Sequence, residues 1–164
     1  MTDPLTGQKA PDFTLPRDGG GTVSLADLAG APVVVYFYPR DDTPGCTREA
    51  IDFSEKAADF AARGATVLGI SADSVAKHDR FRDKHDLSIA LLSDEDAAVC
   101  TAYGVWVEKK MYGKTFMGIE RATFVVGADG TIAQVWRKVK VPGHVDEVQA
   151  AVGELTGGAH GQVE

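Results

Sequence analysis

The sequence has little cysteine. Its 164 residues include two cysteines, Cys46 and Cys100, which stand far apart in the chain. This count excludes a disulfide-stabilised framework of the kind that small secreted domains use. No close set of cysteine and histidine residues has the spacing of a zinc site, so the pattern gives no sign of a structural metal.

Long apolar runs and an excess of basic residues are also missing. No stretch approaches the roughly 20 residues that a helix needs to cross a bilayer, and residues 1–6 lack the basic and apolar regions of a signal peptide. The net charge of −7 argues against nucleic acid as a partner. We therefore predict a cytoplasmic protein that binds neither membranes nor nucleic acids and keeps its thiols reduced.

The composition is that of an ordinary globular domain, with 44% hydrophobic and 25% charged residues. We expect a single domain over residues 1–156 and a flexible tail over residues 157–164. The pattern leaves no long apolar stripe exposed. A monomer is therefore the predicted state, with a homodimer as the alternative.

Apolar and amphipathic segments alternate along the chain, which predicts strands and helices in turn after an N-terminal β-hairpin. The predicted strands cover 13–15, 22–25, 32–38, 65–70, 89–92, 121–126 and 131–136, the helices 24–28, 44–63, 74–85, 94–103 and 144–155, and a solvated loop 105–119. This order indicates an α/β domain whose mixed central sheet has helices on both faces. In such sheets, function gathers beyond the carboxyl ends of the strands.

Cys46 lies beyond one of these ends, at the junction between the strand 32–38 and the following helix. Thr43 suits the N-cap and Pro44 suits the first helical position, which places Cys46 in the first turn. The first turn of a helix has unpaired N–H groups and the positive end of the dipole, and both favour an anion. We therefore expect Cys46 to be a reactive thiolate in an exposed turn and not an inert core cysteine.

Two segments resemble a known family. Residues 36–49, Tyr-Phe-Tyr-Pro-Arg-Asp-Asp-Thr-Pro-Gly-Cys-Thr-Arg-Glu, resemble the active-site segment of the peroxiredoxins, in particular the branch called peroxiredoxin Q or bacterioferritin comigratory protein. Residues 118–124 resemble the strand that carries the family's active-site arginine, which would be Arg121 here. The resemblance implies a thioredoxin-like fold and the reduction of hydrogen peroxide and organic hydroperoxides, with no metal or organic cofactor.

The resemblance also implies a role for five residues. Cys46 would attack the peroxide as a thiolate and become a sulfenic acid. Arg121 would hold the thiolate and polarise the peroxide, and the Thr43 hydroxyl would donate a hydrogen bond to sulfur or oxygen. Pro39 would shield the thiolate from water, and Glu49 would orient Arg121.

The sequence departs from the family pattern at the second cysteine. Many members of the branch have a resolving cysteine five positions after the first, where this chain has Ile51, and others have it on the next helix, where residues 74–85 include none. Cys100 remains, and its short apolar helix favours a packed core cysteine. We therefore predict a one-cysteine cycle in which thioredoxin, glutaredoxin or a low-molecular-weight thiol resolves the sulfenic acid.

Several alternatives stay open at this point. Cys100 could resolve Cys46 after local unfolding of the helix start, or the chain could be a redox sensor that does not turn over. A dithiol oxidoreductase needs Cys-x-x-Cys, and Glu49 occupies the second cysteine position. A cysteine hydrolase needs a partner histidine, and no motif surrounds the four candidates, which are His78, His85, His144 and His160.

Overall fold

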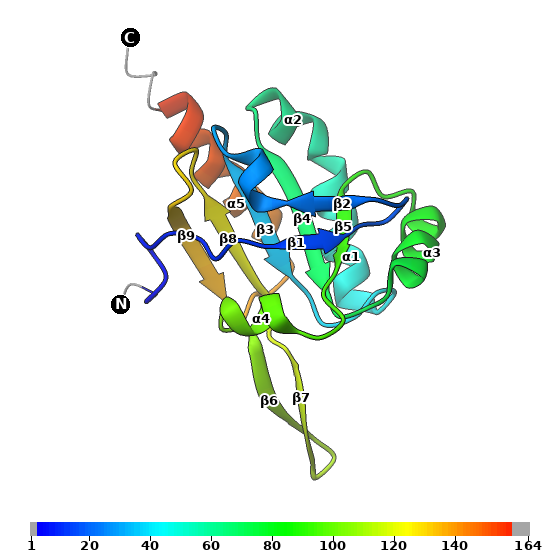
Figure 1. The fold of residues 1–164 in the computed structure, drawn as a ribbon. Coiled ribbons are helices and arrows are strands. Elements are labelled where there is room, and N and C mark those ends of the chain that lie inside the picture. Colours follow the sequence, from blue (N-terminus) through cyan, green and yellow to red (C-terminus); the bar gives the residue numbers. More distant parts are fainter. Residues whose placement is uncertain (1–2, 159–164) are drawn as a thin grey trace.

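The protein, described here by a computed structural model, is an α/β fold whose placement is defined for residues 3–158. Figure 1 shows the elements in chain order. They are β1 (Thr14–Pro16), β2 (Thr22–Ser24), the 3₁₀-helix η1 (Leu25–Leu28), β3 (Val33–Phe37), α1 (Pro44–Glu55), α2 (Ala57–Ala62), β4 (Thr66–Ser71), α3 (Val75–His85), β5 (Ala90–Ser93), α4 (Ala98–Ala102), β6 (Trp106–Met111), β7 (Lys114–Ile119), β8 (Ala122–Val126), β9 (Ile132–Arg137), α5 (His144–Gly153) and the π-helical turn η2 (Glu154–Gly158).

A five-stranded sheet in the order β5-β4-β3-β8-β9 forms the centre of the fold. Strands β3, β4 and β5 are parallel, whereas β8 and β9 run antiparallel to their neighbours. The predicted mixed sheet is thus confirmed. Strand β3 is buried along its whole length because it is a central strand with a covered surface on each side.

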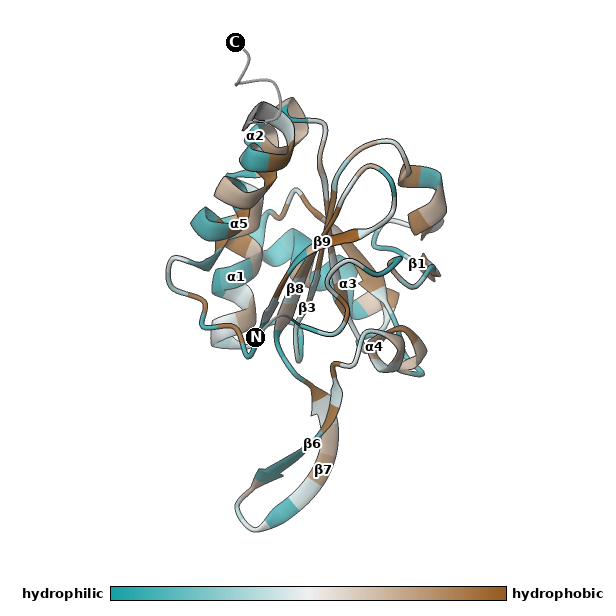
Figure 2. Ribbon diagram, turned by 90° about the vertical axis from the view of Figure 1, so that its left-hand side faces the viewer, coloured by the Kyte–Doolittle hydropathy of each residue, from teal (hydrophilic) through white to brown (hydrophobic). Residues whose placement is uncertain are grey.

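The two faces of the sheet carry separate cores. Val33, Val35 and Phe37 of β3 point into one apolar cluster, and Val34 and Tyr36 point into the other, as the two-residue period of a strand requires. Figure 2 places α1, α2 and α5 along one face and β1 and α4 along the other. Helices therefore cover both faces, as predicted, with the longer ones on the side of α1.

Residues 105–119 form a hairpin, so the predicted loop is wrong. Strands β6 and β7 pair in register from Trp106–Ile119 to Met111–Lys114, and the hairpin extends away from the body of the domain (Figure 1). Its turn residues Tyr112 and Gly113 both have positive φ values, 52° and 75°, as a tight hairpin turn requires. The sequence hid this hairpin because its turn is Tyr-Gly and its strands are rich in lysine, which strands disfavour.

The structure also bears on the predicted helix 44–63 and on the predicted C-terminal tail. The predicted helix 44–63 is interrupted at Lys56, which separates α1 from α2. The predicted tail, 157–164, lies outside the described residues except for Gly157 and Gly158, which belong to η2. None of the helices within residues 3–158 has the length and apolar character needed to span a bilayer.

Candidate active site

The start of α1 places Cys46 at the carboxyl end of β3. Thr43 is the N-cap and Pro44 the first helical residue, as predicted, so Cys46 lies in the first turn, where backbone N–H groups have no partner within the helix. The Cys46 side chain is 1% exposed and belongs to the core on the α1 face. The expectation of an exposed thiol is therefore wrong. Arg40, Asp42 and Pro44 of the turn are exposed, but the sulfur points inward.

Arg121 reaches this sulfur from a distant part of the sequence. It directly precedes β8, which pairs with β3 so that Ala122 lies opposite Phe37. This register carries the guanidinium to the end of β3, where Nη2 lies 3.4 Å from Cys46 Sγ. A Cβ atom on Gly45 would lie 3.1 Å from the same Nη2, so glycine provides the space that the guanidinium needs.

Glu49 binds the other side of the same guanidinium. Arg121 Nη1 donates to Glu49 Oε1 at 2.6 Å, and the Glu49 side chain is fully buried. Burial raises the pKa of Glu49 to about 7, although the charge and hydrogen bond of Arg121 act in the opposite direction. Near neutral pH the Glu49 carboxyl is therefore partly protonated. In the protonated form it no longer neutralises Arg121, so more of the guanidinium charge is available to the sulfur.

The Thr43 hydroxyl makes a different hydrogen bond from the one that the resemblance implies. The Thr43 hydroxyl donates to the carbonyl oxygen of Arg40 at 2.9 Å and makes no cap hydrogen bond to the helix. Because this hydrogen bond uses the hydroxyl proton, the Thr43 oxygen can accept a further hydrogen bond but cannot donate one in this arrangement. Pro39 is exposed at the start of the loop, and shielding of the sulfur by its ring stays a prediction.

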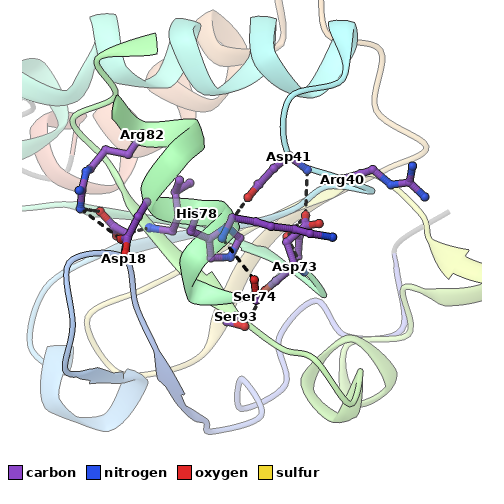
Figure 3. Close-up of polar contacts among 12 residues, drawn as sticks. Asp18, Arg40, Asp41, Asp73, Ser74, His78, Arg82 and Ser93 are labelled. Atoms are coloured by element: carbon purple, nitrogen blue, oxygen red, sulfur yellow. Dashed lines mark hydrogen bonds and ion pairs between the residues drawn. The ribbon is translucent and has the colours of Figure 1, made fainter. Parts of the chain in front are cut away.

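A buried polar network anchors the loop between β3 and α1 (Figure 3). Asp41 accepts a hydrogen bond from the Tyr38 hydroxyl at 2.6 Å and lies 2.6 Å from Nδ1 of His78. The Asp41 amide donates to Asp73 at 2.8 Å. The other ring nitrogen of His78 lies 2.9 Å from the Leu92 carbonyl oxygen, which can only accept. The network ties the loop that leads to Cys46 to α3 and β5.

His78 is best described as an imidazolium paired with the Asp41 carboxylate. Both of its ring nitrogens face acceptors, and its side chain is fully buried. Burial alone would lower the pKa of His78, but the hydrogen bond and charge of Asp41 outweigh it and raise that pKa. A raised pKa means that the folded state holds this proton more tightly than the unfolded chain does.

Replacing His78 by glutamine is expected to lower the free energy of unfolding by about 3 kcal/mol, because it leaves the Asp41 carboxylate buried without its cation. The pair's contribution is fully present below the unfolded histidine pKa of about 6.5 and is lost as the pH rises through the raised folded value. Urea unfolding at several pH values measures this. His85→Gln is the matched control, since His85 lies on the same helix and pairs with the exposed Asp42. Equal losses in the two variants would contradict the buried pair.

Cys100 lies on the other face of the sheet. It is fully buried among the side chains of the β1 and α4 side, whereas Cys46 belongs to the opposite core. Burial raises the pKa of Cys100 strongly, and the neighbouring Asp94 carboxylate raises it further. Both cysteines are free. Cys100 is thus a poor nucleophile, separated from Cys46 by the sheet.

The remaining histidines do not form a hydrolase site within residues 3–158. His85 contacts Asp42, and His144 lies 2.8 Å from the Thr123 hydroxyl, with burial lowering the pKa of His144 to about 4. His160 lies outside the described residues. No three potential metal ligands gather within the described part of the chain.

Gly45, Asp41 and His78 are site residues that were not predicted from the sequence. The available signals were a glycine directly before the reactive cysteine and a lone histidine on the apolar face of the helix 74–85. Neither signal indicates which residue is the partner. Arg121 reaches Gly45, and Asp41 reaches His78, only in the folded domain.

The fold and this site define a thiol peroxidase, with one buried sulfur at a helix start and one arginine against it. The model of the AhpC/TSA family matches residues 6–135, and the chain belongs to that family, in its Bcp or peroxiredoxin Q branch. The Bacillus subtilis peroxiredoxin Bcp is 46% identical over 150 residues, which cover 92% of this chain and 96% of that protein. The Xanthomonas campestris peroxiredoxin Bcp is 47% identical over 154 residues, covering 93% and 96%.

Solved structures agree with this assignment. The Xanthomonas campestris bacterioferritin comigratory protein, studied for alkyl peroxide reduction, has a TM-score of 0.82 at 44% identity, covering 93% of this chain and 94% of that one. A Xylella fastidiosa PrxQ mutant has a TM-score of 0.84 at 39% identity, covering 99% and 97%. These matches confirm the predicted thioredoxin-like fold and the predicted family.

Proposed function

We propose that this enzyme reduces hydrogen peroxide and organic hydroperoxides through a sulfenic acid at Cys46. The thiolate attacks the terminal peroxide oxygen, the S–O bond forms, and the O–O bond breaks. The leaving hydroxide or alkoxide takes up a proton and departs as water or an alcohol, while the sulfur is oxidised by two electrons. The alkyl peroxide reduction named for the Xanthomonas relative supports organic hydroperoxides as substrates.

The observation that carries this proposal is the contact between Arg121 Nη2 and Cys46 Sγ, 3.4 Å in length, at a helix start. A fixed cation and free N–H groups favour negative charge on the sulfur and then on the leaving oxygen. Glu49 holds the guanidinium in place from its other side. In our proposal the Thr43 hydroxyl accepts a hydrogen bond from the incoming peroxide, and Pro39 limits the access of water to the sulfur.

We propose a one-cysteine cycle. An outside thiol attacks the sulfenic acid, water leaves, and a second thiol releases the resulting mixed disulfide. The position of Cys100 on the far face of the sheet and its raised pKa support this over resolution by Cys100. Thioredoxin, glutaredoxin or a low-molecular-weight thiol is the proposed reductant. We further propose that residues 1–156 form one domain and that the protein is a monomer. We propose that it acts in the cytoplasm, where such thiols are abundant.

Steady peroxide consumption with each class of reductant tests this proposal. We expect continued turnover of hydrogen peroxide and of cumene hydroperoxide with at least one thiol donor. A redox sensor would instead consume one equivalent of peroxide and stop, whatever reductant is supplied. Consumption that ends after one equivalent with all three classes of reductant would contradict the proposed enzyme.

A further inference from the structure

Lys109 lies across the base of the β6–β7 hairpin. It pairs with Phe116 on the neighbouring strand, and its ammonium donates to the Ile119 carbonyl oxygen at 2.5 Å. A Cβ atom on Gly118 would lie 3.2 Å from Cδ of Lys109 and 3.4 Å from Cε. The lysine stem therefore passes over a glycine, which leaves room for it to turn back from the hairpin toward the domain.

The other lysines of the hairpin do not make this turn. Lys110 and Lys114 are exposed, whereas Lys109 is half-buried. Lys110 pairs with Thr115 and so belongs to the opposite face of the hairpin, because successive residues of a strand alternate in direction. The hairpin thus holds one lysine against its base and leaves the other two in solvent.

The base of the hairpin leads directly to the arginine that contacts the reactive sulfur. Arg121 follows Ile119 by two residues and contacts Cys46 Sγ. Burial lowers the pKa of Lys109, and the positive charge of Arg121 lowers it further, while the negative charges of Cys46 and Glu120 act in the opposite direction. The Lys109 ammonium is held at Ile119 and the Arg121 guanidinium follows two residues later. Two cations placed in this way repel each other, and an anion between them would relieve the repulsion.

We propose that the Lys109 ammonium is a second fixed cation of the active site, a positioning residue that favours negative charge on the Cys46 sulfur and then on the leaving oxygen. It acts through space, since Arg121 makes the direct contact with the sulfur. The proposal rests on the peroxidase function proposed above. It gives the β6–β7 hairpin a role in the reaction and not only at the surface.

Single-turnover oxidation of Cys46 by hydrogen peroxide tests this role, because an uncharged oxidant does not itself bind an ammonium. We expect Lys109→Met to slow the reaction about three- to tenfold at neutral pH, the size of effect that one charge exerts across a partly solvated site. The rising limb of the rate against pH should move to higher pH. Lys109→Arg should stay within about twofold of the wild type, and the matched control Lys110→Met should not differ from it.

Gly118→Ala supplies an independent variant should Lys109→Met be poorly folded. The added methyl group would lie 3.2 Å from Cδ of Lys109, so the lysine stem has to shift by a few tenths of an ångström. The variant should therefore reproduce a small part of the loss in the wild-type background and none in the Lys109→Met background. An unchanged pH profile in Lys109→Met, or equal losses at Lys109 and Lys110, would overturn the proposal. A wild-type protein that fails to react with peroxide would instead refute the peroxidase function itself.

Discussion

Cys46→Ser is expected to abolish peroxide turnover, with a loss of at least about a thousandfold, because a serine hydroxyl is not oxidised by peroxide and offers no comparable nucleophile. The arginine, the helix start and the surrounding core would all remain in place. The sulfur is buried and lies 3.4 Å from the Arg121 guanidinium, so no other group of the site can take over its chemistry. Peroxide consumption in the presence of an excess of thiol measures the loss.

Cys100→Ser is the matched control for this variant. It should keep most of the wild-type turnover, since Cys100 lies in the opposite core and has a raised pKa. A hydroxyl at this buried position lowers stability by a few kcal/mol at most, and Cys100→Ala separates that effect from any redox role. Loss of turnover in both Cys100 variants, with the fold intact, would show that Cys100 takes part in the cycle.

Arg121→Met is expected to slow the oxidation of Cys46 by about a hundred- to a thousandfold. The guanidinium is the group that contacts the sulfur in the described structure. Removing one fixed donor of this kind typically lowers the rate by a factor of about this size. Arg121→Lys should recover only part of the loss, because a lysine cannot hold the sulfur and Glu49 at once as the two guanidinium nitrogens do. Stopped-flow measurement of the single oxidation step gives these rates directly.

The loss in Arg121→Met must be separated from a loss of stability. Without Arg121, the buried Glu49 carboxyl has no cation, and burial then raises its pKa further and favours the protonated form. Adding Glu49→Gln should restore stability without restoring the rate. Arg137→Met serves as a second control, since Arg137 is a half-buried arginine that pairs with Asp3. A rate that recovers in the Arg121→Met, Glu49→Gln double variant would contradict the role of the guanidinium.

The reactive part of the site follows from local patterns. The β-branched segment before Pro39, the Thr-Pro start of α1 and the Cys46 between them are all readable over about fifteen residues, because the strand and the helix cap are local structures. Arg121 could be named only through resemblance to a family. Its distance from Cys46 depends on the register between β3 and β8, which no local pattern specifies.

The features that were not predicted depend on tertiary context. The burial of the Cys46 sulfur results from packing against the core on the α1 face, although the turn around it is polar and exposed. The pair between Asp41 and His78 joins residues from a loop and a helix that meet only in the folded domain. The sequence pattern does not indicate the hairpin over 106–119, because its residues favour solvent and its turn is unusual.

Intact-mass analysis after one equivalent of hydrogen peroxide, without reductant, tests the central claim most directly. The account predicts that the chain gains one oxygen atom, located by peptide mapping on Cys46 and trapped by a sulfenic-acid reagent. A chain that instead loses two hydrogen atoms, with Cys46 and Cys100 joined in one peptide pair, would contradict the one-cysteine cycle. Oxidation that spares Cys46 altogether would contradict the account as a whole.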